Sequence, residues 1–184
     1  TSTYDLNLSS AANSAAPDIE REALGFFGQL LGLPAEMAGV FVTGATMANV
    51  AGLAIGREWA GQQQGISVAQ AGLHAVPPIP VLTGEAHSST FKALALLGMG
   101  RANVTLLPVL AGNREAVDVA ALATALAALD GAPAIVVANA GTVNTVDFDD
   151  LAAIAALRER FPFWLHVDAA FGGLAACSPV YRPL

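Results

Sequence analysis

The sequence is poor in charge and almost free of cysteine. Charged residues make up 12% of its 184 positions, and 8 Lys and Arg stand against 15 Asp and Glu, for a net charge of −7. Nucleic acids and anionic membranes reward clustered basic residues, so this acidic chain is expected to bind neither. Cys177 is the single cysteine. It excludes an internal disulfide and a cysteine-based zinc site, and it indicates a reducing, cytoplasmic compartment.

Long apolar runs and targeting segments are also lacking. A membrane-spanning helix needs about 18 or more apolar residues, and the most apolar helical stretch, residues 116–129, is interrupted by Asp118 and Thr124. The first ten residues, TSTYDLNLSS, have neither the basic start nor the apolar run of a secretory signal, so we do not expect export. Because 54% of the residues are hydrophobic, the chain should instead bury a core of one domain or a large part of one.

Several motifs of common enzyme classes are missing. The sequence contains no GxGxxG after a strand, no GxxxxGK[ST] and no GxSxG, so the dinucleotide-binding, P-loop and hydrolase-elbow classes lack their central residues. The three histidines, at positions 74, 87 and 166, are widely separated. We therefore expect no metal site.

What the sequence does contain is a regular alternation of short β-rich runs and Ala/Leu-rich helical runs. Strands are expected at residues 40–43, 81–83, 104–107, 135–138 and 163–167. Helices are expected at residues 19–31, 46–59, 89–97, 117–129 and 149–160. Short apolar strands joined by helices predict an α/β fold, a mainly parallel sheet with helices on both faces. Residues 61–80 are uncharged and are interpreted as a surface loop.

Ligands of such a fold belong at the carboxyl ends of the strands, and three segments deliver polar residues there. The first, residues 39–49, reads GVFVTGATMAN. Backbone N–H groups, the Thr46 hydroxyl and the positive end of a helix would converge where an anion could sit. The alternative is that Thr43 or Thr46 only caps the helix.

The second segment, residues 83–98, carries His87 between a strand and an apolar helix. A histidine there can lie flat over an aromatic ligand ring or move a proton. The alternative is a loop histidine that faces solvent. Ser88 and Ser89 are interpreted as ordinary residues of a helix start.

The third segment joins residues 139–151 to residues 163–173, FWLHVDAAFGG. Asp168 is the first charged residue after the expected strand, and small residues that would leave room for a flat ligand follow it: Ala169, Ala170, Gly172 and Gly173. A buried carboxylate needs a cationic partner, and a protonated pyridine nitrogen is a candidate. The alternative is that Asp168 caps the next helix.

Four motifs in this order, TGATMAN, EAHSS, AGTVNT and LHVDAAFGG, resemble the pyridoxal-phosphate-dependent group II amino-acid decarboxylases, the aromatic-L-amino-acid and glutamate decarboxylase type. The similarity covers nearly the whole chain and begins at NSAAPDIEREALGFFGQLLGLP. The resemblance implies an aspartate-aminotransferase-like large domain (fold type I). Residues 1–38 would be an N-terminal segment and helix, and residues 39–184 an incomplete cofactor-binding domain.

The resemblance also implies seven residues around pyridoxal 5'-phosphate. They are Ala45 (through its N–H) and Thr46 at the phosphate, His87 stacked on the pyridine ring, Thr142 near the phenolic oxygen, Asp168 at the ring nitrogen, Ala170 on the ring face opposite His87, and His166 as a supporting partner of Asp168. Among these, His87 and Asp168 would be catalytic. A carboxylate beside the ring nitrogen favours its protonated form, which accepts the electrons left by lost carbon dioxide.

The chain departs from the family pattern in two places. The family's Schiff-base lysine lies some dozens of residues beyond the aspartate, whereas the only lysine here is Lys92, five residues after His87 and expected at the surface. We therefore expect the chain to be a piece of a longer protein, inactive alone, whose next two strands would lie between the first strand and the rest of the sheet. Val143 stands where many relatives have a second threonine.

The resemblance implies that the full-length protein decarboxylates an amino acid. We expect an aromatic substrate and a homodimer. Two alternatives stay open. One is an aminotransferase or aldehyde-forming relative on the same fold, and the other is a non-catalytic α/β module that binds phosphorylated metabolites or a partner domain.

Overall fold

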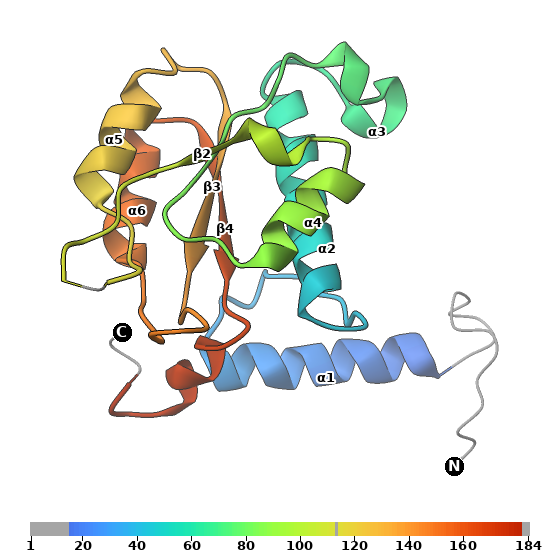
Figure 1. Cartoon of the computed structure of the whole chain (residues 1–184). Helices are drawn as coiled ribbons and strands as arrows, with labels where there is room; N and C mark the ends of the chain where they lie inside the picture. The colour runs from blue at the N-terminus through green and yellow to red at the C-terminus, as the bar shows by residue number, and fades with distance from the viewer. Residues whose placement is uncertain (1–14, 113, 182–184) are drawn as a thin grey trace. The chain divides into compact units, whose positions relative to one another are not determined.

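The computed structural model describes residues 15–112 and 114–181 (Figure 1). These residues fall into two compact units, one made of Thr43–Gly173 and the other of the residues before it together with those from 174 onward. The expected boundary between residues 38 and 39 remains a prediction about the full-length protein.

The larger unit contains a four-stranded sheet. Its strands are β1 (Val81–Thr83), β2 (Val104–Leu106), β3 (Ala134–Asn139) and β4 (Phe163–Asp168). They lie in the order β2-β1-β3-β4, and all pairs are parallel. This confirms the expected α/β class and four of the five expected strands.

The expected strand at residues 40–43 is wrong, because no strand forms there. A strand requires a neighbour that completes its backbone hydrogen bonds, and β4 ends the sheet with β3 as its single partner among the described strands. The run Val-Phe-Val-Thr at 40–43 has the composition of a strand. It pairs with no other strand in the described part of the chain.

Helices cover both faces of the sheet. The α-helices of the larger unit are α2 (Ala45–Gln62), α3 (Val68–Ala71), α4 (Ser88–Leu96), α5 (Val119–Ala127) and α6 (Leu151–Ala156). In Figure 1, α2 and α4 lie on one side of the sheet and α5 and α6 on the other. Short 3₁₀ turns occur at Leu73–Ala75, Arg101–Asn103, Leu157–Glu159 and Gly173–Cys177. No helix in the described part of the chain is both long and apolar enough to cross a membrane.

Each face of the sheet has its own hydrophobic core. Leu53 and Leu94 are buried on the α2 and α4 side, and Leu122 and Ile154 are buried on the α5 and α6 side. Every residue of β3 is buried, as expected for a central strand covered on both faces. The buried positions of α2 include Asn49, Leu53, Gly56 and Ala60, a spacing that places them on one helical stripe.

The interpretation of residues 61–80 as a surface loop is wrong in part. The segment contains α3 and a 3₁₀ turn, and Val68, Val76 and Ile79 are buried in the core on the α2 side. Its apolar residues are widely spaced, so neither a helical nor a strand period indicates that they face inward.

The smaller unit is built on α1 (Ala16–Leu31). Pro17 lies in its first turn, and Gly32, in the left-handed conformation with φ 70°, ends it, a common stop signal for a helix. The Phe27 and Phe41 rings meet edge to face with centroids 6.2 Å apart, and the Phe41 N–H donates to Glu20 Oε1 at 2.8 Å. These contacts hold the segment after α1 against the helix.

Candidate functional site

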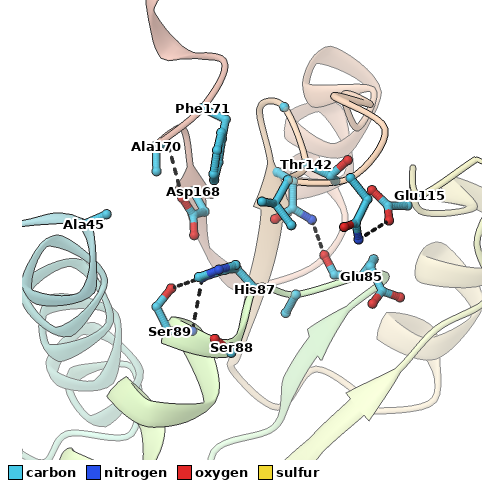
Figure 2. Close-up of a pocket in the computed structure, with 15 residues that line it drawn as sticks. Ala45, Glu85, His87, Ser88, Ser89, Glu115, Thr142, Asp168, Ala170 and Phe171 are labelled. Atoms are coloured by element: carbon cyan, nitrogen blue, oxygen red, sulfur yellow. Dashed lines mark hydrogen bonds between the residues drawn. The ribbon is translucent and has the colours of Figure 1, made fainter.

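A cavity of about 220 Å³ lies at the carboxyl edge of the sheet (Figure 2). Its walls come from the chain after each of the four strands and from the start of α2. The register places Asn139 of β3 beside Asp168 of β4, so adjacent strands end at the same level. The parallel sheet therefore gathers segments that are far apart in the sequence.

The start of α2 forms one end of the cavity. The N-cap is Gly44 with φ 145°, no side chain caps the first turn, and Ala45 lines the cavity. The capping alternative for Thr43 and Thr46 is therefore wrong. The unpaired N–H groups of a helix start attract an anion. Thr46 follows in the same turn but is not among the lining residues.

His87 forms a second wall and also begins α4. It is the N-cap residue, and its Nδ1 accepts the Ser89 N–H at 3.2 Å and lies 2.7 Å from Ser89 Oγ. The ring still borders the cavity. His87 therefore caps α4 and also lies where its ring could contact a ligand.

Asp168 lies deep in the cavity wall and is 9% exposed. Its Oδ1 accepts the Ala170 N–H at 3.1 Å, which closes a local turn. This turn ends before the next helical element, Gly173–Cys177, so Asp168 does not cap that element as the alternative expected. Its Oδ2 accepts from Asn49 Nδ2 at 2.9 Å. Neither of these donors is charged, and no described Lys or Arg forms an ion pair with Asp168. The site therefore presents an uncompensated buried carboxylate, which favours a cationic ligand group.

His166 reaches Asp168 through another residue rather than directly. Its Nε2 lies 2.8 Å from Asn49 Oδ1, and Asn49 in turn donates to Asp168. Burial is the main cause that lowers the pKa of His166, and the nearby Asp168 charge opposes this. Sequence reasoning missed Asn49, although a polar residue on the buried stripe of α2 was a usable signal.

Thr142 lines the cavity within a tight turn. Its Oγ1 lies 3.0 Å from Thr145 Oγ1 and accepts the Asp147 N–H at 3.1 Å. Val146 in the same turn has φ 57°, a left-handed conformation that is strained for a β-branched residue. The turn must be held by other contacts.

Two carboxylates hold this turn. Arg114 Nη2 donates to Asp147 Oδ1 at 2.6 Å and lowers the pKa of Asp147 to about 2. The side chains of Thr142, Asn144 and Thr145 lower the pKa of Glu115 to about 2. Glu115 also lines the cavity, so this wall carries an ionised acid.

Glycines join the segments after β3 and β4. A Cβ on Gly172 would collide with Ala140 O and the Phe148 ring, and Gly141, with φ 86°, lies against the backbone of Gly172. The Gly172 N–H donates to Ala140 O at 2.8 Å. We expected Gly172 to leave room for a ligand, but it makes room for the neighbouring segment instead. Ala170 does line the cavity, as expected.

The structure brings five of the seven expected site residues to one cavity: Ala45, His87, Thr142, Asp168 and Ala170. In Figure 2, Ala170 and His87 border it on different sides, with Asp168 between them. Phe171 also lines it and was not anticipated. Lys92 is exposed on α4 and does not line the cavity, as expected.

Comparison with known proteins shows which families and relatives the chain is similar to, independently of the site geometry. Residues 4–184 match the family model "Pyridoxal-dependent decarboxylase conserved domain". The chain is 31% identical to L-2,4-diaminobutyrate decarboxylase of Acinetobacter baumannii and 32% identical to tryptophan decarboxylase 1 of Oryza sativa subsp. japonica. These alignments cover 90% and 93% of this chain and 35% of each relative. The chain thus spans about a third of the length of these relatives.

Solved structures agree in fold. The glutamate decarboxylase domain of a Vibrio parahaemolyticus transaminase and L-2,4-diaminobutyrate decarboxylase superposes with a TM-score of 0.83 at 25% identity, covering 96% of this chain and 39% of that one. A structure of Oryza sativa TDC with PLP and tryptamine gives a TM-score of 0.80 at 29% identity, covering 95% and 39%.

Proposed function

The chain belongs to the pyridoxal-dependent decarboxylase family, and on that premise we propose that the full-length protein uses pyridoxal 5'-phosphate to remove carbon dioxide from an amino acid. The single observation that carries the proposal is the buried, uncompensated Asp168 carboxylate in the wall of a cavity that also contains His87 and the uncapped start of α2.

The donor set of the cavity fits this cofactor in three places. The N–H groups at Ala45, together with the Thr46 hydroxyl, would hold the phosphate, because a helix start without a cap attracts dianionic groups. The Asp168 carboxylate would bind the cationic ring nitrogen.

The flat ring would lie between His87 and Ala170. Imidazole offers an aromatic face, and the methyl group of Ala170 is small enough to leave the opposite face accessible. Thr142 would lie near the phenolic oxygen. Its hydroxyl already accepts the Asp147 N–H, so its orientation is fixed before the ligand binds, which reduces the ordering cost of binding.

When bound, the cofactor supplies an electron sink for the carbanion that decarboxylation leaves at Cα. Asp168 acts by holding a proton at the ring nitrogen, because a nearby negative charge favours the protonated form. His87 and Ala170 would fix the orientation of the ring by lying against its two faces. Lys92 is exposed on α4, so the lysine that binds the cofactor aldehyde would lie outside these 184 residues, and we expect the chain alone to be inactive.

The test uses the full-length protein. Added pyridoxal phosphate should give the visible absorbance of bound cofactor, and incubation with amino acids should yield carbon dioxide and an amine. A keto acid or an aldehyde as the main product would favour the aminotransferase or aldehyde-forming alternative. Absence of any cofactor spectrum would favour the non-catalytic module. Lys92→Gln is a matched control that should behave as the parent does.

The finer properties of the full-length protein are proposals as well. Relatives at similar identity are named for diaminobutyrate, tryptophan and, at 34% identity in Rattus norvegicus, cysteine sulfinic acid, so we propose an amino-acid substrate without choosing one side chain. We also propose a cytoplasmic homodimer. The free Cys177 supports a reducing compartment, and light scattering on the purified protein tests the dimer.

A further inference from the structure

Asn49 is a buried residue of α2 that does not line the cavity. It is 3% exposed, and its side-chain amide contacts three side chains from other elements. Nδ2 lies 3.0 Å from Ser89 Oγ and 2.9 Å from Asp168 Oδ2, and Oδ1 lies 2.8 Å from His166 Nε2. One amide thus joins α2, α4 and β4 directly behind the cavity wall.

The partners determine which way the amide faces. An ionised carboxylate can only accept hydrogen bonds, so the NH₂ group must face Asp168, and its second proton is directed at Ser89 Oγ. The amide oxygen is left for His166, whose Nε2 must then carry a proton. Burial lowers the pKa of His166 and so favours the neutral ring, and the Asn49 oxygen at Nε2 sets which nitrogen holds its proton. A flipped amide would set an oxygen against the Asp168 carboxylate.

The same reasoning extends through Ser89 to His87. Because Ser89 Oγ accepts from Asn49, its own proton is available for His87 Nδ1 at 2.7 Å, and the Ser89 N–H donates to the same nitrogen. Two donors on Nδ1 leave the ring proton on Nε2. The orientation and tautomer of His87 are therefore linked to the amide that also holds Asp168.

The backbone around Asn49 supports this arrangement. Gly52 lies three residues further along α2, and a Cβ there would come within 2.7 Å of the His166 ring. A Cβ at Gly56 would come within 3.0 Å of Trp164 Nε1. The missing side chains allow α2 to lie close to β4, which places Asn49 within hydrogen-bond distance of both His166 and Asp168.

We propose that Asn49 is a positioning residue that sets the orientation of Asp168 and, through Ser89, the tautomer of His87, without touching the cofactor itself. The inference rests on the proposed function, because it assigns a purpose to the two groups expected at the cofactor ring. The Asn49 amide couples Asp168 to His87, so that a change in the amide should alter the orientation of Asp168 and the tautomer of His87 together.

The experiment compares Asn49→Ala, Asn49→Asp and Ser89→Ala in the full-length protein. The control is Asn103→Ala, which removes another amide hydrogen bond, from Nδ2 to Ile79 O at 2.8 Å, outside the cavity lining. The first readout is the side-chain ¹⁵N chemical shifts of histidine in the cofactor-free protein. The second is the affinity for pyridoxal phosphate and the pH dependence of its bound absorbance.

The parent should show His87 and His166 each with Nδ1 unprotonated and Nε2 protonated. Asn49→Ala should alter both signals and weaken cofactor affinity by about tenfold or more, the effect of losing a hydrogen bond to a charged group. Ser89→Ala should alter the His87 signal alone. Asn103→Ala should change neither signal.

The Asn49→Asp variant separates positioning from space filling. Aspartate has nearly the same shape as asparagine but sets an acceptor against Asp168. If Asn49 acts by donating, this variant should weaken cofactor binding and shift the pH profile more than Asn49→Ala does. If Asn49 only fills space, the isosteric variant should be the milder one, and that result would overturn the proposal.

Failures of the two proposals can be told apart. A parent protein that does not bind pyridoxal phosphate overturns the proposed function, whereas the histidine signals of the cofactor-free protein still test the coupling. If the Asn49 variants do not fold, as judged by circular dichroism, the Ser89→Ala variant decides the matter. An unchanged His87 signal in Ser89→Ala would contradict the link.

Discussion

The two walls of the cavity are held in place by different physical means. The Asp168 wall is buried and rests on a neutral amide, a neutral imidazole and close helix–strand contact through Gly52. The Thr142 wall is the turn of residues 142–147. Thr142 itself is buried, but the charged groups that hold the turn lie nearer to solvent, with Arg114 against Asp147 and Glu115 against the turn. Buried hydrogen bonds from uncharged donors are screened much less by salt than exposed ion pairs are. The residue proposed for the most demanding chemistry thus lies on the wall that added salt disturbs least.

The largest effect is expected at Asp168 itself. Asp168→Asn should keep the cofactor bound but reduce turnover roughly 10²- to 10³-fold, because one preorganised electrostatic group is lost. Asp168→Glu should be partly tolerated, since it keeps the charge. Steady-state kinetics with a parallel cofactor titration measure both. A loss of cofactor binding with unchanged turnover per bound cofactor would assign Asp168 to binding alone.

The next effect concerns the packing behind the same wall. Gly52→Ala places a Cβ 2.7 Å from His166, and such overpacking costs about 1–3 kcal/mol. Gly28→Ala in α1, where nothing lies within 4 Å of the added Cβ, should instead stabilise by about 0.5–1 kcal/mol. Chemical denaturation measures whether each variant has a lower or a higher free energy of unfolding than the parent. Equal effects would show that α2 and β4 are not in the close contact described.

On the other wall, removal of the ion pair should have a smaller, salt-dependent effect. Arg114→Ala should weaken cofactor affinity about fivefold or less at low salt, because exposed ion pairs contribute little in water. The difference from the parent should shrink at high salt, while the deficit of Asn49→Ala should not. Titrations at two salt concentrations test this. If the loss of cofactor affinity in Arg114→Ala did not depend on salt, the two walls would not differ in their sensitivity to salt as we expect.

The two walls should also respond to acid in different pH ranges. The pKa of His166 is lowered from 6.5 by burial, so the unfolded chain binds its proton more readily, and stability should fall as pH decreases below about 6.5. The pKa values of Asp147 and Glu115 are lowered to about 2. Their stabilisation is fully present above their ordinary values of 3.8 and 4.5 and is lost progressively as pH falls from there through about 2.

Hydrogen exchange of backbone amides, corrected for the intrinsic rate, follows each wall separately. Protection of β4 in the parent should decrease from pH 7 to pH 5, and His166→Gln should remove most of that decrease. Protection of the turn at residues 142–147 should stay constant over this range. Parallel losses of protection in both segments would show that they respond as one unit.

Much of the fold was predictable because local patterns determine it. The helices at α1, α2, α4, α5 and α6 and all four observed strands follow from apolar periodicity and β-branched runs. Residues 40–43 were predicted as a strand and are not one, because strand formation depends on a neighbour that a local pattern cannot supply. Residues 61–80 were misread because isolated apolar residues carry no period.

For the site, residue types at strand ends indicated His87, Asp168 and the small Ala170, and the family resemblance added Ala45 and Thr142. The sequence pattern could not show that Gly172 accommodates the Phe148 ring, because that contact depends on how two loops meet. The buried stripe of α2 could have indicated that Asn49 faces inward, but it could not identify the three partners, which lie 40, 117 and 119 residues away. Side chains that act through other side chains are fixed by tertiary structure.

The most direct test of the account is the protonation state of the cofactor ring nitrogen. Pyridoxal phosphate labelled with ¹⁵N at that atom, bound to the full-length protein, should show the chemical shift of a protonated pyridinium at neutral pH. In Asp168→Asn it should show that of a neutral pyridine. A neutral ring in the parent protein, or an identical shift in both proteins, would contradict the role assigned to Asp168.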